Sequence, residues 1–118
     1  MRNIIKYTKH NKVRFSSLKS REKGTRLFIE FFDSIRREQA GKEMKGHMIL
    51  ESITDLRESI VLTFWETKED MDKFYSPQNK FLASLVERAQ PLFEKMPERA
   101  DHAISDLSFD DNLTHVNN

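Results

Sequence analysis

Residues 60–71, Ile-Val-Leu-Thr-Phe-Trp-Glu-Thr-Lys-Glu-Asp-Met, carry the strongest structural signal in the sequence. Along residues 60–65 the side chains alternate between two faces of a strand, and both faces are mostly apolar. Such a strand has to be covered on both sides, by helices on one side and by something else on the other. Thr67 then resembles a helix N-cap, with Asp70 at the third position after it, so a helix is expected from Lys68 to about Tyr75.

The segments before this strand predict a hairpin and a helix. Residues 46–52 form a second apolar strand, and the polar turn at 54–58 joins it to the strand at 59–65 as an antiparallel pair. Further upstream, apolar residues repeat at helical spacing through residues 27–35. Gly41 fits the position after the end of that helix, and residues 17–24 are expected to form a loop.

The N-terminal residues 3–16 contain β-type residues in two pieces, with His10-Asn11 between them as a turn or a bulge. They form either one long strand or an arm followed by a strand. Val13 and Phe15 alternate with polar neighbours, which is typical of a half-buried strand.

Two proline-marked breaks follow the short helix. Ser76-Pro77 predicts a cap and a first helical position, and Pro91 ends or kinks the helix that follows. A last strand is expected over residues 102–109 by alternation. The predicted order is β-α-β-β-α-β, which is the α+β class with a ferredoxin-like split β-α-β antiparallel sheet. We therefore expect a single domain at 1–109 and a polar tail at 110–118.

Composition limits the function classes. The 118 residues have a formal net charge of +1 and no one-sided basic run, which argues against nucleic-acid binding. The chain has no cysteine, and its four histidines show no metal-ligand spacing, so no metal site is expected. No apolar run approaches the length of a membrane span. A cytoplasmic protein is expected, and the two-sided apolar strand predicts a homodimer with two sheets packed face to face.

A family resemblance emerges from the central residues. Residues 46–52, a polar turn, residues 59–71, then Phe74, Ser76 and Phe81 resemble the antibiotic biosynthesis monooxygenase domain family. The resemblance implies the dimeric α+β barrel fold, with a pocket between sheet and helices. One branch of that family oxidises aromatic molecules without metal or flavin, in a cavity poor in water.

A second branch of the family binds and degrades haem. It uses an asparagine on the first strand, the tryptophan, and a histidine nine or ten residues after the tryptophan as iron ligand. In this chain Trp65 matches, Asn3 or Asn11 is available for the asparagine, and Phe74 and Tyr75 occupy the histidine positions. No cofactor is therefore expected, with haem held through Tyr75 as a remote alternative.

The resemblance implies a pocket for a small apolar or aromatic molecule. The candidate lining residues are Trp65, Tyr75, Phe74, Phe28, Phe32, Phe81, Asn11 and His47. For these aromatic residues a structural role in the core is the first interpretation, and lining of the pocket is the second. Two hypotheses therefore stand: a cofactor-independent monooxygenase acting on such a molecule beside Trp65, and a non-catalytic binding or interaction module on the same scaffold. A haem-binding or haem-degrading protein is the third alternative.

Overall fold

The computed structural model describes residues 4–38 and 41–110, so Asn3 and residues 111–118 of the predicted tail lie outside it. The elements, in chain order, are β1 (Tyr7–Arg14), α1 (Leu18–Arg37), β2 (Met44–Glu51), β3 (Glu58–Trp65), α2 (Lys68–Phe74), α3 (Lys80–Ala89), the short 3-10 helix η1 (Gln90–Leu92) and β4 (Glu98–Ala103).

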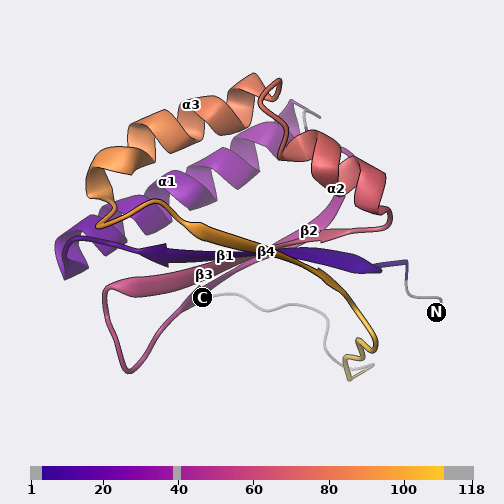
Figure 1. Ribbon diagram of the computed structural model, residues 1–118, viewed down its shortest axis with the longest axis horizontal. Coiled ribbons are helices and arrows are strands. Elements are labelled where there is room, and N and C mark those ends of the chain that lie inside the picture. The colour runs from indigo at the N-terminus through magenta and orange to yellow at the C-terminus, as the bar shows by residue number, and fades with distance from the viewer. Residues whose placement is uncertain (1–3, 39–40, 111–118) are drawn as a thin grey trace.

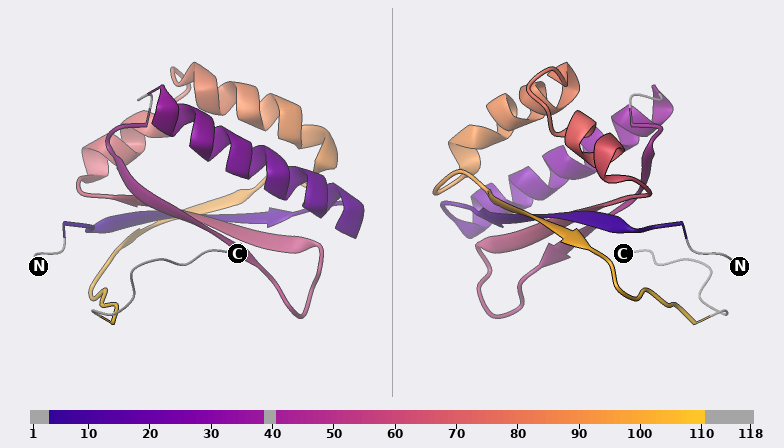
Figure 2. Two further views of the ribbon diagram at one scale, coloured as in Figure 1. Left: turned by 180° about the vertical axis from the view of Figure 1, so that it is seen from behind. Right: turned by 45° about the vertical axis from the view of Figure 1, so that its right-hand side comes forward.

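The four strands form one antiparallel sheet in the order β2-β3-β1-β4. The three α-helices formed by the described residues all cover the same face of this sheet, and none of them lies against the other face (Figures 1 and 2). This arrangement confirms the predicted ferredoxin-like α+β fold. It also confirms the hairpin, because β2 pairs with β3 across the polar turn.

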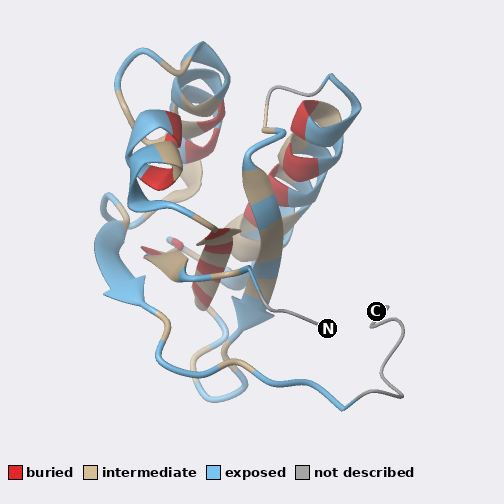
Figure 3. Cartoon of the chain, turned by 90° about the vertical axis from the view of Figure 1, so that its right-hand side faces the viewer, coloured by how far each residue is buried: buried red, intermediate tan, exposed pale blue. Residues whose placement is uncertain are grey.

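The core lies between the sheet and the helices, where the buried segments of β1, β3 and α1 face one another (Figure 3). Its buried apolar residues are Val13, Phe15, Phe28, Phe32, Ile35, Val61, Trp65, Met71, Phe74, Leu85 and Ala89. Trp65 is 1% exposed, and on β3 every second residue is buried against the helices. One apolar face of β3 is therefore covered within the chain.

The first helix begins earlier than the sequence pattern predicted. The Ser17 side chain accepts a hydrogen bond from the Ser20 backbone N–H at 3.0 Å, so residues 18–24 are helical and the predicted loop is wrong. The first residues of this helix are mostly polar, so they show no apolar residues at helical spacing from which a helix could be predicted. Gly24 lies on this added segment, where a Cβ atom would stand 2.2 Å from the Phe15 ring. Only glycine lets the helix approach the strand so closely.

Two further helix boundaries differ from prediction. The first helix ends at Arg37, so Gly41 is not the residue next after its end, although its N–H donates to the Ile35 carbonyl at 3.4 Å. The third helix is capped by Asn79, which accepts from two backbone N–H groups, rather than by Ser76. Ser76 and Pro77 lie in the connecting turn before the helix. The serine-proline pattern that predicted a cap there is not followed directly by a helix.

The strands β1 and β4 account for the remaining differences. β1 is one continuous strand, and His10 and Asn11 lie inside it instead of forming a turn. β4 spans Glu98–Ala103, before most of the predicted residues 102–109. All six of its residues are exposed, so this edge strand carries no apolar alternation from which a sequence pattern predicts a strand.

Within the described residues, no helix is both long and apolar enough to cross a membrane. The same residues contain no group of three or more histidine or carboxylate side chains placed to hold a metal ion.

Candidate functional site

A small apolar cavity lies between the sheet and the helices. Its volume is about 50 Å³. The side chains that line it come from β1, β3, all three α-helices and the start of β4: Asn11, Val13, Phe28, Phe31, Phe32, Val61, Phe74, Tyr75, Leu82, Leu85, Val86, Ala89, Phe93, Pro97 and Arg99. Asn11, Tyr75 and Arg99 are the polar members of this lining. We call this space the inner cavity.

A chain of hydrogen bonds runs along one wall of the inner cavity. The indole Nε1–H of Trp65 donates to Thr63 Oγ1 at 2.9 Å, and Thr63 Oγ1 lies 2.9 Å from the Tyr75 hydroxyl. Asn11 Nδ2 donates to the Val61 carbonyl at 2.9 Å and to the Tyr75 hydroxyl at 3.3 Å. The carbonyl partner determines the amide orientation of Asn11, because only the NH₂ group can donate there.

The chain of hydrogen bonds does not satisfy every donor and acceptor in it. Thr63 Oγ1 and the Tyr75 hydroxyl each carry one proton, and only one of these protons can lie between the two oxygens. The second hydroxyl proton has no acceptor among the described residues. Asn11 Oδ1, whose residue lines the inner cavity, also accepts no hydrogen bond from them. When Thr63 donates to Tyr75, the free proton lies on Tyr75, and one donor and one acceptor are then left on residues that line the cavity.

The Tyr75 hydroxyl is held in its neutral form. Burial is the main cause that raises the pKa of Tyr75 above its ordinary value of 10.0, and it outweighs the opposing hydrogen bonds from Thr63 and Asn11. Part of the ring stays exposed at the mouth of the cavity, while the hydroxyl points inward between its two partners. At neutral pH Tyr75 is therefore a hydrogen-bonding group and not a base.

Two cations lie against the Tyr75 ring. Lys9 Nζ is 4.8 Å from the ring centre, and the Arg99 guanidinium carbon is 5.1 Å from it. Lys9 is neutralised by an ion pair with Asp101 at 2.6 Å. Arg99 has no carboxylate within 4.0 Å among the described residues, so its charge is available at the cavity mouth.

A wider hollow continues outward from the inner cavity. It measures about 540 Å³ and shares five lining residues with the cavity: Tyr75, Leu82, Val86, Pro97 and Arg99. Pro77, Ala83 and Met96 add further apolar surface to it. We call this space the outer hollow. Together the two spaces form a shallow entrance with a narrow apolar end.

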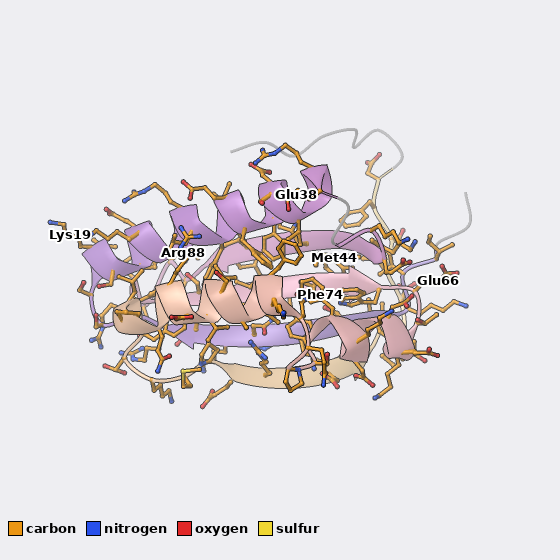
Figure 4. The ribbon with its side chains drawn as sticks, turned by 90° about the horizontal axis from the view of Figure 1, so that it is seen from above. Lys19, Glu38, Met44, Glu66, Phe74 and Arg88 are labelled. Carbon is orange, nitrogen blue, oxygen red and sulfur yellow. The ribbon has the colours of Figure 1, made fainter. Side chains whose placement is uncertain are left out.

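The structure brings together five of the eight predicted pocket residues. Asn11, Phe28, Phe32, Phe74 and Tyr75 all line the inner cavity, and Phe74 lies among the helices above the sheet (Figure 4). The other three predicted residues do not line it.

Trp65 lies behind the wall, with its ring centre 5.2 Å from Phe74 and 6.5 Å from Tyr75. It does border a separate surface hollow of about 370 Å³, together with Phe74 and the half-exposed Phe81. His47 stacks on Phe32 at 4.0 Å and faces another hollow.

The residues present do not fit haem. A tyrosine that ligates iron does so as a tyrosinate, whereas burial raises the pKa of Tyr75 and its oxygen is engaged by Asn11 and Thr63. The inner cavity is also only a third of the roughly 150 Å³ that accommodates a single benzene ring in a known apolar cavity. We therefore derive no chemistry through haem, and the prediction of no cofactor stays a prediction.

Three polar residues of the site were missed by sequence reasoning. Lys9 and Arg99 lie on exposed-looking polar strands, and Thr63 lies within an apolar one. Lys9 lies two residues from Asn11 on β1, so the alternation of the strand places both on the same face. This is the one sequence signal that pointed to Lys9. Arg99 had no signal, because the last strand was predicted to begin only at residue 102.

Comparison with solved structures places the fold. A protein from Caulobacter crescentus CB15, provisionally named an antibiotic biosynthesis monooxygenase, aligns with a TM-score of 0.71 at 7% identity, over 86% of this chain and 92% of that one. A similarly named protein from Chloroflexus aurantiacus J-10-fl aligns with 0.66 at 12% identity, over 88% and 97%. A dimeric ferredoxin-like protein from an uncultured marine organism aligns with 0.68 at 13% identity, over 90% and 93%.

These likenesses confirm the predicted kind of fold, which this chain shares with proteins provisionally named antibiotic biosynthesis monooxygenases. No family model matches the sequence, and no curated protein matches it. At identities this low the likeness establishes the fold alone.

Proposed function

We propose that the protein is a cofactor-independent monooxygenase that acts on a small, flat phenol or enol. The observation that carries this proposal is the unclosed hydrogen-bond chain at the wall of an otherwise apolar cavity. One hydroxyl proton of the Thr63–Tyr75 pair and Asn11 Oδ1 have no partner among the described residues, and Asn11 and Tyr75 both line the cavity. A hydroxyl-bearing aromatic ring supplies both an acceptor and a donor to these groups.

The two spaces suit two reactants. The outer hollow, at about 540 Å³, is large enough for an aromatic ring, which lies against Leu82, Val86 and Pro97. The inner cavity, at about 50 Å³, is too small for a ring and has a nearly apolar lining, which suits dioxygen. The ring oxygen then lies near Arg99 and Tyr75, where the two spaces meet.

The chain's own groups favour the ionised substrate. The Arg99 guanidinium stabilises a phenolate or enolate by charge, and Tyr75, being neutral, donates a hydrogen bond to the same oxygen. The electron-rich ring then reduces dioxygen directly, without a metal or flavin cofactor. For a phenol the balance is one phenol and one O₂ giving one quinone and one water: one oxygen atom enters the ring as a carbonyl, and the other leaves with the two hydrogens lost.

We also propose that the working form is a homodimer. The face of the sheet opposite the helices carries Ile60, Leu62 and Phe64 on β3, with Met48 and Leu50 beside them on β2. Met48 is 37% exposed and Leu50 41%. A second copy that packs its own open face on this one covers that apolar surface, and one structural neighbour is described as a dimeric ferredoxin-like protein.

Fluorescence of Trp65, the chain's only tryptophan, tests binding. Trp65 lies against Phe74 and Tyr75, which line the cavity, so a bound ring changes its emission. We expect 1-naphthol to bind at least about tenfold more tightly than naphthalene, because the hydroxyl pairs with the free polar groups. Asn11→Leu and Tyr75→Phe should remove this preference. Tyr7→Phe, at the other tyrosine of the chain, should leave it intact.

Oxygen uptake tests turnover with any phenol that binds. A monooxygenase consumes one O₂ for each quinone formed and releases no hydrogen peroxide, and Arg99→Gln should slow it more than a Lys19→Gln control. Binding without oxygen uptake would contradict the enzyme and support the second candidate, a non-catalytic small-molecule carrier. That candidate is favoured by one observation: within residues 4–38 and 41–110, no carboxylate or imidazole lines the inner cavity to act as a base. Absence of any binding would reject both.

A further inference from the structure

We propose that a second site, separate from the inner cavity, binds the phosphate group of a small phosphate monoester. It lies in a hollow of about 400 Å³ between the end of α1 and the start of β2. Four nitrogen-bearing side chains line this hollow, those of Arg36, Lys42, Lys45 and His47, and none of the described carboxylates does. The proposal does not depend on the oxygenase function.

The positive charge of this hollow is not neutralised. Among the described residues, neither Arg36 nor Lys45 has a carboxylate within 4.0 Å, and Lys42 has only an exposed contact with Glu43 at 3.9 Å. Asp33 is close enough to act on His47 but does not line the hollow. Three cations converging on one concave surface repel one another unless an anion lies between them.

Arg36 is not explained by its place in the last turn of a helix. Cations in that position usually pair with free backbone carbonyls, but here the Glu38 N–H donates to the Ser34 carbonyl and the Gly41 N–H to the Ile35 carbonyl. The Arg36 guanidinium instead contacts a ring nitrogen of His47 at 3.4 Å. Its remaining N–H groups have no hydrogen-bond partner in the described part of the chain and can bind an oxyanion, to which arginine donates two parallel hydrogen bonds.

His47 can donate a hydrogen bond into the same hollow. Its ring stacks on Phe32 at 4.0 Å with an angle of 13° between the planes, so its orientation is constrained. Burial, and next the charge of Arg36, lower the pKa of His47 below 6.5, so the imidazole is neutral at pH 7. With Nδ1 accepting from Arg36, the proton lies on Nε2, which is left as a hydrogen-bond donor.

The shape of the hollow favours an ester over free phosphate. About 400 Å³ exceeds the needs of one tetrahedral anion, and Phe32, Ile35 and Met44 supply apolar surface beside the charges. Phe32 also lines the inner cavity, so its ring separates the two sites. A small organic group attached to the phosphate packs against this apolar part.

Histidine NMR of the full chain tests the proposal, with the His47 signals assigned by His47→Gln. At pH 7.5, inorganic phosphate should shift the His47 signals saturably, whereas sodium chloride at equal ionic strength should not. Phenyl phosphate should bind more tightly than inorganic phosphate. Bound dianion should also raise the pKa of His47, because it favours the protonated ring.

Arg36→Gln should weaken phosphate binding about tenfold or more, as expected for the loss of a charged hydrogen-bonding partner. The double variant Lys42→Gln/Lys45→Gln provides an independent check if Arg36→Gln unfolds. Lys19→Gln should have no effect, because Lys19 lies at the opposite end of the molecule from Met44 (Figure 4). A shift that never saturates, an equal response to chloride, or unchanged binding in the Arg36 and lysine variants would overturn the proposal. Equal affinity for phosphate and phenyl phosphate would reject the ester.

Discussion

Both faces of the sheet carry large apolar residues along β3, but the helices cover only one of them. Val61 and Trp65 face the helices and are 7% and 1% exposed, whereas Ile60, Leu62 and Phe64 on the other side remain only partly buried. The helices form a single layer, and a single layer covers one face (Figure 2). Apolar residues on both sides of one strand therefore do not require the chain to cover both sides itself. Here the helices cover one side, and the other side is left for a different kind of contact.

The open face is itself divided. Its β2–β3 half carries Met48, Leu50 and the apolar side chains of β3, while its β1–β4 half carries Lys12, His10 and His102. The rings of His10 and His102 lie 6.2 Å apart. A second copy gains most of its contact free energy from the apolar half, since burying the polar half requires new partners.

The largest expected effect distinguishes the closed face from the open one. Trp65→Ala removes a fully buried side chain and leaves Thr63 without its donor, so it should lower the free energy of unfolding by about 3–5 kcal/mol. Ile60→Ala should cost clearly less in a monomer. Urea denaturation at low and high protein concentration measures both, and an Ile60→Ala cost that does not rise with concentration would count against the dimer.

The next effect concerns the open face alone. Leu62→Lys places a charge at the centre of the proposed interface and should weaken self-association by about 3 kcal/mol, roughly a hundredfold in Kd. Light scattering of the variant should give the monomer mass at micromolar concentration. Lys80→Gln, on the outer surface of the helical layer, should leave the mass unchanged. A wild-type protein that is already monomeric would reject the homodimer.

A smaller effect is expected inside the closed face. Thr63→Val leaves the Trp65 indole N–H and the Tyr75 hydroxyl without their shared partner, at a cost of about 1–3 kcal/mol in unfolding free energy. Tyr75→Phe should cost less, because Thr63 still accepts from Trp65. The two changes should not add, and a double-mutant cycle by urea denaturation measures this. Full additivity would show that the hydrogen-bond chain is not one unit.

The smallest effect is a pH dependence. Because the folded-state pKa of His47 is lowered, the unfolded chain takes up a proton first as the pH falls below 6.5. The stability that neutral His47 contributes is thus present above pH 6.5 and is lost below it. His47→Gln should flatten the dependence of unfolding free energy on pH in this window. His102→Gln is the matched control, and an equal flattening there would contradict the assignment to His47.

Sequence reasoning succeeded where one local pattern settled the structure. The hairpin of β2 and β3, the N-cap at Thr67 and the break at Pro91 depend on residues close in the chain. It failed at the start of α1 and at β4, where polar residues form regular elements. Those elements gain their stability from packing or pairing with distant segments, which leaves no periodic signal of their own.

The candidate site shows the same division. The aromatic residues and the asparagine that the resemblance marked as pocket candidates include five of the fifteen described residues that line the inner cavity. Which of them meet, and that Trp65 lies behind the wall instead of lining it, depends on the packing of α2 against β3. Arg99 reaches Tyr75 only because β4 pairs with β1 at the sheet edge.

Local sequence was thus enough to establish an apolar strand that ends in tryptophan, turns into a helix and needs cover on both sides. Only the tertiary structure decided which side the chain covers itself, and that Trp65 lies behind the wall of the inner cavity. The physical reason is the range of the forces involved. Hydrogen bonds of turns and caps join neighbours in sequence, whereas burial and cavity shape depend on side chains that the fold brings together from distant positions.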